Sequence, residues 1–309
     1  MRAGIASLGF IAFCACGDVV VGNFNAESEE SGALEQTMAL VVGADRLRAL
    51  SLDGGLTWEP GLSEGPDPEL VLYGVDYGDG QFIAVGGETT SRIERSSDGE
   101  TWEVVYQGQG QGLRDVVYTG QFWIAVGVGG EVMRSSDGVA WESQIVPIVN
   151  TKLSAVASDG DQLLLAVGDG DVIGSFNGGD EWLHKFDDGL PHTAVAYGGA
   201  FVVADADGTV HVLAENLADW VASHDIAAGL SDLIYAEGRY LAVGGVNLYE
   251  ANDPNDWSMS WVDEGMSRLA YRDGRYLGLG GDGRFRSDDG INWQRAASGE
   301  PGHALVLGD

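Results

Sequence analysis

Cysteine is nearly absent from this chain of 309 residues: the only two, Cys14 and Cys16, lie at its very start. No disulfide framework can therefore hold the body of the protein together. Proline is also scarce, with 7 residues against 48 glycines, a balance that favours many tight turns over a disordered low-complexity chain. The apolar period typical of amphipathic helices is missing throughout, which leaves β-structure as the expected fold class.

Basic residues are few as well. Lysine and arginine number 16 against 48 aspartates and glutamates, so the formal net charge is −32. Such a surface repels phosphate backbones, which excludes general binding of nucleic acid. The acidity is typical of a soluble or salt-adapted surface, and a surface that attracts cations is the alternative.

The first apolar run, from Ala3 to Ala15, is too short to span a bilayer comfortably and has the length of a secretory core segment. The Phe13-Cys14-Ala15-Cys16 segment resembles a bacterial lipoprotein signal, with a small residue before the modified Cys16. A buried N-terminal strand is the alternative interpretation. We predict a signal peptide over residues 1–15, a lipid on Cys16, and an acidic tether over residues 16–37, which are rich in Glu and Ser.

Tryptophans recur through the rest of the chain at spacings of 36 to 44 residues. They are Trp58, Trp102, Trp141, Trp182, Trp220, Trp257 and Trp293. Seven units of about forty residues have the period of a β-propeller. We therefore predict one propeller domain over residues 38–309.

Each unit contains four apolar, β-branched runs separated by glycine-containing turns. The third unit shows them most clearly, as LRDVVYTG, QFWIAVGVGG, EVMRSSDG and WESQIV. The prediction is an all-β, seven-bladed propeller of four-stranded antiparallel blades. The first unit lacks an inner strand, so His303–Gly308 is expected to pair with residues 38–60 and close the ring.

A short polar motif precedes most of these tryptophans, as in SLDGGLTW at 51–58 and SSDGETW at 96–102. On these motifs the chain resembles the Asp-box, or bacterial neuraminidase repeat, β-propellers. The box residues are Ser51, Asp53, Gly55 and Trp58; Ser96, Asp98, Gly99 and Trp102; Ser135, Asp137, Gly138 and Trp141; Ser175, Asn177 and Trp182; Asn216 and Trp220; Asp253 and Trp257; and Ser287, Asp289, Gly290 and Trp293. The family includes sialidases, other glycosidases, sorting receptors and photosystem assembly factors, so the resemblance implies a fold more than a function.

We interpret the boxes as structural and not as catalytic residues. At the turn between the third and outermost strands, the carboxylate and hydroxyl can bond backbone groups that the turn leaves unpaired. Boxes spread around a rim cannot converge on one substrate.

Two groups of residues are candidates for ligand binding at the opposite end of the axis. Arg46 (or Arg48), Arg92 and Arg284 begin the third strands of neighbouring blades. If they converge, they could clamp a carboxylate, as the resemblance to sialidases implies; arginines that cover adjacent strands and pair with carboxylates are the alternative.

The second group lies where inner strands begin. It comprises His192, His303, Arg114 and Arg268, with Asp115 and Asp232 at comparable positions. These residues could bind a polar ligand or simply hydrate a narrow axial channel.

The histidines have no metal-ligand spacing, and we expect neither a metal nor a cofactor. The predicted function is that of a non-catalytic, monomeric lipoprotein of the bacterial cell envelope, anchored to the membrane by its lipid. Its propeller disc would bind an envelope protein or a glycan. A sialidase-like glycoside hydrolase is the alternative, and two carboxylates at glycosidase separation in a deep pocket would favour it.

Overall fold

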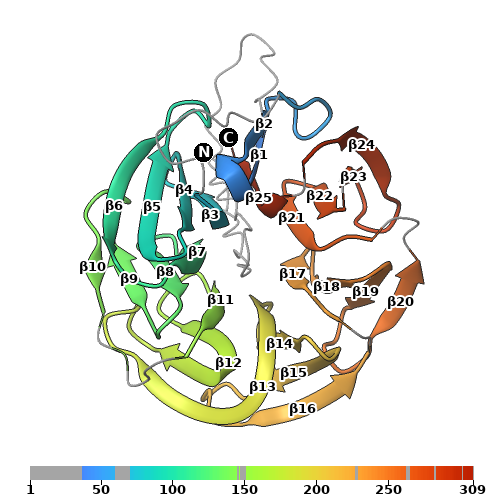
Figure 1. Ribbon diagram of the computed structural model, residues 1–309. Helices are drawn as coiled ribbons and strands as arrows, with labels where there is room; N and C mark the ends of the chain where they lie inside the picture. Colours follow the sequence, from blue (N-terminus) through green and yellow to red (C-terminus); the bar gives the residue numbers. More distant parts are fainter. Residues whose placement is uncertain are drawn as a thin grey trace, which may run out of the picture.

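The computed structural model describes residues 37–59, 70–144, 146, 151–226, 229–261, 265–281, 283–300 and 302–308. They form β-strands that pack around one central axis, with a single 3-10 turn, η1 (Ala44–Arg46) (Figure 1). The predicted signal peptide, Cys16 and most of the predicted tether lie outside these residues. In the described part of the chain, no helix is long and apolar enough to cross a membrane.

Hydrogen bonds join the strands into six antiparallel sheets, of which four have four strands. These are β3 (Leu72–Gly78), β4 (Gln81–Gly86), β5 (Thr90–Ser96) and β6 (Glu103–Gln109); β7 (Leu113–Tyr118), β8 (Trp123–Gly127), β9 (Val132–Ser135) and β10 (Glu142–Ser143); β17 (Asp232–Ala236), β18 (Arg239–Gly244), β19 (Asn247–Ala251) and β20 (Ser258–Trp261); and β21 (Arg268–Arg272), β22 (Arg275–Gly280), β23 (Gly283–Ser287) and β24 (Gln294–Ser298). A fifth sheet has three strands, β1 (Met38–Gly43), β2 (Arg48–Ser51) and β25 (Gly302–Gly308). The sixth has six strands, β11 (Leu153–Ser158), β12 (Leu164–Ser175), β13 (Leu183–Tyr197), β14 (Phe201–Asp205), β15 (Thr209–Leu213) and β16 (Trp220–Asp225).

The prediction of seven four-stranded blades is wrong, because the propeller has six hydrogen-bonded sheets. The difference arises in the six-stranded sheet, which takes up two of the predicted units. Glycine-containing turns were expected to separate the runs of each unit, yet the glycine-containing segment at 167–171 lies within the continuous strand β12. Pairs such as Asp169↔Pro191 and Asp171↔Asp187 extend the β12–β13 ladder through it, and β13 then pairs with β14 from His192 onwards. The ladder is therefore not interrupted where the two units were expected to separate.

The predicted closure of the ring is confirmed by the pairing of the two ends of the described chain. Strand β25 lies antiparallel to β1, with Leu40 opposite Val306 and Val42 opposite Ala304. Strand β25 also contacts β3 on one side and β21 on the other, so the innermost strands form an unbroken circle around the axis (Figure 1).

The core lies between neighbouring sheets, because successive side chains of a strand point to opposite faces. In β1, Leu40 packs in one buried cluster with Leu72 of the following sheet, whereas Val41 packs in another with Leu279 of the preceding sheet. A strand buried on both faces has a continuous apolar sequence, which explains why the inner runs show no polar alternation.

The polar side chains of the Asp boxes bond within their own turns. In the 96–102 box, Asp98 Oδ1 accepts the backbone N–H groups of Glu100 (2.9 Å) and Thr101 (2.7 Å). Ser96 Oγ accepts the N–H of Gly99 (2.8 Å), and Trp102 Nε1 donates to the Gly99 carbonyl (2.9 Å). The same bonds recur at 51–58, 135–141 and 287–293. These bonds satisfy the backbone donors that the turn leaves unpaired.

The box glycine also fits the turn against the preceding sheet. Gly99 has φ 74°, a conformation that favours glycine, and a Cβ at this position would lie 2.7 Å from Cδ1 of Leu50. Gly138 and Gly179 are placed in the same way against Ile83 and Ile124. The box therefore fixes both the hairpin and the distance between neighbouring sheets.

Replacement of Asp98 by Ala is expected to lower the free energy of unfolding by about 1–2 kcal/mol, because two backbone donors of the turn lose their charged acceptor. Urea unfolding of the parent and the variant measures the difference. Glu100→Ala, which changes an exposed side chain of the same turn, serves as the control and should unfold with the parent. Equal stability of Asp98→Ala and the parent would contradict the structural role of the box.

Candidate functional site

The first predicted group, Arg46, Arg92 and Arg284, is only partly brought together. Arg92 Nε donates to Glu94 Oε1 at 2.7 Å, and Arg48 from β2 pairs with the same carboxylate. Burial, with the charges of Arg46 and Arg92 close by, lowers the pKa of Arg48 to about 10. Arg46, Arg48 and Arg92 therefore form one buried cluster whose central acceptor is a carboxylate of this chain.

Arg284 lies in a different environment. Its guanidinium carbon lies 4.7 Å from the ring centroid of Trp58, and burial alone lowers its pKa. The arrangement resembles Arg48, which lies 5.2 Å from the Trp102 ring. Each arginine thus covers the box tryptophan of the next sheet, as a cation–π contact. The contacts of Arg92 with Glu94 and of Arg284 with Trp58 are those of the alternative in which these arginines cover adjacent strands and pair with carboxylates.

Three residues of the second predicted group lie in one contiguous cluster with Tyr73, which we call the axial cluster: Tyr73, Arg114, Arg268 and His303. The Arg114 guanidinium carbon lies 4.1 Å from the centroid of the Tyr73 ring, and the Tyr73 ring centroid lies 5.4 Å from that of His303. Arg268 Nε donates to the His303 carbonyl at 2.8 Å. The four residues come from β3, β7, β21 and β25, which belong to four consecutive sheets around the axis (Figure 1).

The axial cluster is half-buried and positively charged. Burial lowers the pKa of Arg114, although Tyr73 and the exposed Glu88 oppose this effect. Burial and the neighbouring charge of Arg268 lower the pKa of His303, which favours a neutral imidazole at pH 7. The Tyr73 hydroxyl donates to Glu88 Oε1 at 3.3 Å. The cluster therefore combines two cations, an aromatic ring and a neutral imidazole at the end of the disc opposite the boxes.

Tyr73 and Glu88 were not among the predicted residues. Tyr73 occupies the position of Arg114 and His303 at the start of its own inner strand, so aligning these strand starts could have identified it. The contact of Glu88 with Tyr73 depends on the conformation of the turn before β5, which carries no motif.

His192 lies apart from the axial cluster. Its buried Nδ1 lies 2.6 Å from Asp205 Oδ1, and the other oxygen of Asp205 lies 2.8 Å from Nε2 of His211. The sequence identified His192 from its place before an inner strand. Its polar contacts are with Asp205 on β14 and, through Nε2 at 3.2 Å, with Asp188 on β13, while His211 lies on β15. This second group is therefore a buried side-chain network within the six-stranded sheet.

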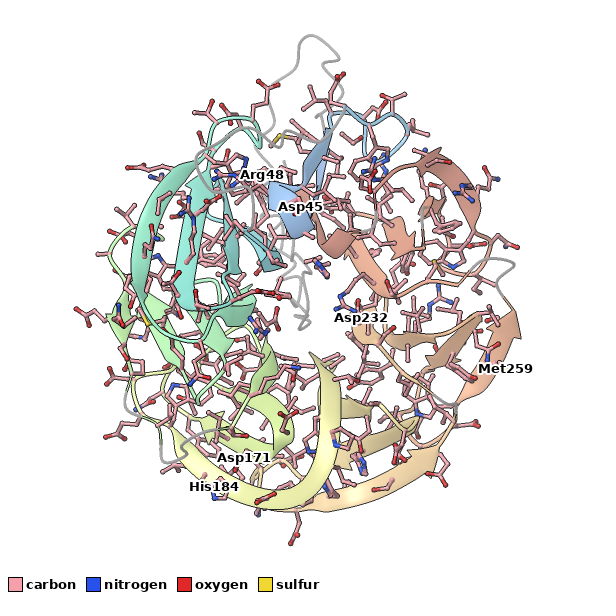
Figure 2. The ribbon with its side chains drawn as sticks, viewed as in Figure 1. Asp45, Arg48, Asp171, His184, Asp232 and Met259 are labelled. Carbon is pink, nitrogen blue, oxygen red and sulfur yellow. The ribbon has the colours of Figure 1, made fainter. Side chains whose placement is uncertain are left out.

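Buried aspartates link the inner strands of neighbouring sheets. Asp232 accepts the N–H of Leu233 (2.9 Å) and, with its other oxygen, the N–H of Leu269 in the next sheet (2.7 Å). Asp115 and Asp76 make the same type of bridge, to Val156 (2.8 Å) and Tyr118 (2.7 Å). Figure 2 shows Asp232 close to the axis. Asp115 and Asp232, which the sequence placed near the axis as part of a ligand site, thus bond the backbone.

These aspartates are deeply desolvated. Burial raises the pKa of Asp232 to about 7, although Arg268 and two backbone N–H groups oppose the shift. Burial likewise raises the pKa of Asp76 well above its usual range. Among the described residues, no group of three or more His, Cys, Asp or Glu side chains is placed to hold a metal ion.

Replacement of Asp232 by Asn should change how stability depends on pH. The pKa of about 7 in the folded state lies above the ordinary value of an aspartate, so the folded parent takes up a proton between about pH 7 and pH 4 that the unfolded chain does not. The parent is therefore stabilised relative to the variant as the pH falls through this range, by up to about 1.4 kcal/mol per pH unit. Urea unfolding at several pH values measures this difference.

The repulsion within the acidic surface is shared by the parent and Asp232→Asn, so it cancels in their difference. A difference that stays constant between pH 7 and pH 4 would show that Asp232 is ionised throughout.

The sequence matches no family model, and no curated protein matches it. Solved structures do match. A structure of YCF48 bound to D1 peptide is 14% identical, with a TM-score of 0.61, over 79% of this chain and 86% of that chain. YCF48 from Cyanidioschyzon merolae is 17% identical, with a TM-score of 0.57, over 77% and 94%. Sqt1 of Saccharomyces cerevisiae is 9% identical, with a TM-score of 0.63, over 86% and 83%. At these identities the likeness shows the fold, and this chain is a β-propeller.

Proposed function

We propose that this protein is a propeller scaffold of the bacterial cell envelope that binds an acidic segment of another protein at its axial cluster. The main support for this proposal is the axial cluster, in which four consecutive sheets bring together Tyr73, Arg114, Arg268 and His303 at one end of the axis. In a chain of net charge −32, a cluster that contains two arginines is a local site where an anionic group is less strongly repelled.

Both arginines are held in place and retain hydrogen-bonding capacity. Arg114 donates through Nη1 to the carbonyls of Gly87 (3.2 Å) and Leu113 (3.1 Å). Arg268 donates through Nε and Nη1 to the carbonyls of His303, Ser231 and Ser267. Among the described residues, these are the only hydrogen bonds of the two guanidinium groups. Their remaining N–H groups can donate to a carboxylate, and such charge-assisted bonds are strong.

The ligand class follows from this chemistry. A side-chain carboxylate fits the guanidinium groups, and the exposed part of the Tyr73 ring offers an apolar contact for the segment that carries it. A neutral glycan would leave the arginine charges uncompensated, so we favour a protein segment. The structure of YCF48 bound to D1 peptide supports a propeller of similar fold as a peptide-binding scaffold.

The paired replacement Arg114→Gln with Arg268→Gln should weaken binding of an Asp- and Glu-rich peptide by about 100-fold, since each of the two lost charge-assisted contacts contributes about 1.4 kcal/mol, or about tenfold. Isothermal titration calorimetry measures the Kd, and thermal melting checks that the disc stays folded. Arg286→Gln is the matched control, because Arg286 lies at the box end of β23 and pairs there with the exposed Asp288. Unchanged binding in the paired variant, or an equal loss in the control, would contradict the proposal.

A lipid on Cys16 would attach the disc to a membrane through the acidic segment at 16–37. Cys16→Ser should therefore move the protein from the membrane fraction to the soluble fraction, because the acyl chains supply the membrane affinity. Fractionation followed by immunoblotting measures the distribution, and Cys14→Ser is the control that should stay in the membrane. Membrane association that survives Cys16→Ser would refute the anchor and leave the binding site untouched.

A further inference from the structure

The buried network around His192 continues to the surface of the six-stranded sheet. His211 on β15 lies directly opposite Ser223 on β16, and His192 on β13 lies directly opposite Asp205 on β14. The side chains of these two cross-strand pairs are joined by the 2.8 Å contact between His211 Nε2 and Asp205 Oδ2. His211 Nδ1 lies 2.7 Å from Ser223 Oγ. The result is a continuous chain of hydrogen bonds from Asp205 through His211 to Ser223.

The positions of the protons along these hydrogen bonds follow from the ionised state of the Asp205 carboxylate. Its side chain has no solvent exposure, and the hydrogen bonds from His192 and His211 lower its pKa against the effect of burial. An ionised carboxylate only accepts hydrogen bonds, so His192 Nδ1 and His211 Nε2 must both donate to it. In a neutral His211, Nδ1 then carries a lone pair and accepts the hydrogen of the Ser223 hydroxyl. His211 is thus arranged as a general base for Ser223.

Neighbouring side chains fix the position of the His211 ring, whereas Ser223 is exposed to solvent. Trp220 stacks on the His211 ring at a centroid distance of 4.9 Å and an angle of 30°, and Trp220 Nε1 donates to Asp188 Oδ2 at 2.9 Å. His211 is only 5% exposed, whereas Ser223 is exposed on β16, the last strand of its sheet. This strand runs along the outer rim of the disc (Figure 1). Because β16 pairs on one side only among the described strands, alternate backbone N–H groups face away from the ladder and can donate to an oxyanion.

We propose that Ser223, His211 and Asp205 form a nucleophilic site that cleaves small, activated esters at the rim, a function separate from binding at the axial cluster. Ser223 Oγ attacks the ester carbonyl and forms an Oγ–C bond while its proton moves to His211 Nδ1. The bond from the carbonyl carbon to the leaving oxygen breaks, and the alcohol or phenol departs with that electron pair and with the proton from His211 Nδ1. Water then gives a proton to His211 Nδ1 and bonds to the acyl carbon, the bond from that carbon to Ser223 Oγ breaks, the carboxylic acid leaves, and His211 returns the proton to Ser223 Oγ. His192 is a positioning residue, since it contacts Asp205 and not the hydroxyl.

The decisive experiment treats the purified full chain with a fluorophosphonate, which forms an Oγ–P bond with an activated serine and releases fluoride. Peptide mass spectrometry should locate the label on Ser223. The label should disappear in Ser223→Ala and persist in Ser258→Ala, which removes an exposed serine of the outer strand β20 that donates only to a backbone carbonyl. Because the labelling of Ser223 is read on the parent itself, the result does not depend on the folding of a variant.

The role of the base is tested on the same reaction. His211→Gln should slow both labelling and the hydrolysis of p-nitrophenyl acetate by about 100-fold or more, which is the usual contribution of a general base. The parent unfolded in urea, where Ser223 no longer contacts His211, should also lose the label. No phosphonate on Ser223 under conditions that fully label trypsin would overturn the proposal. So would equal labelling of Ser223 in the folded parent, the unfolded parent and His211→Gln.

Discussion

The structure depends on one contact, the packing of each Asp-box turn against the preceding sheet. The Asp and Ser side chains satisfy the backbone of the turn, and this allows a tight glycine to lie directly on an apolar side chain of the neighbour, as Gly99 lies on Leu50. Polar side chains of the preceding sheet reinforce the contact: Gln81 Nε2 donates to the Asp137 carbonyl, and Arg134 Nε donates to the Gly178 carbonyl. The described residues contain no cysteine and no α-helix, so the spacing of their sheets is set by these turns at one end and by the bridging aspartates near the axis.

In a protein with so many carboxylates, the few that are buried identify places where the fold needs a charged side chain. Few carboxylates of the described residues are fully buried. Asp171, for example, is partly exposed and pairs with His184 at 2.8 Å away from the axis (Figure 2). The few that are buried each have a defined structural role. Asp232 bridges two inner strands, Glu94 neutralises Arg48 and Arg92, and Asp205 orients two histidines. Since desolvation of an unpaired charge is costly, such buried carboxylates are retained only where the backbone or a cation compensates them.

Much of the architecture follows from the sequence because its signals are local. The four-run pattern of a unit, the box turns and the pairing of His303–Gly308 with the first described strand depend on periodicity and turn chemistry, which short segments carry by themselves. The number of sheets does not follow, because two predicted units are joined by the continuity of β13 from Leu183 to Tyr197, which depends on its pairing first with β12 and then with β14. A glycine-rich segment predicts a turn equally well whether or not a partner strand extends the ladder.

The residues of the candidate sites likewise divide into those that local sequence signals identify and those whose contacts depend on strand pairing. The starts of the inner strands can be recognised in the sequence, so Arg114, Arg268 and His303 are identifiable without their contacts to Tyr73 and to one another. Ser223 and His211 could not be paired, because their contact depends on the register of β15 against β16, and a shift of one residue would move both side chains to the opposite face.

The two sites also differ in the part of the fold that assembles them. The axial cluster is assembled from four sheets and changes if the ring deforms, whereas the Ser223 network lies within one continuous ladder and depends only on its register. The geometry of the Ser223 network therefore does not depend on the packing between sheets that assembles the axial cluster.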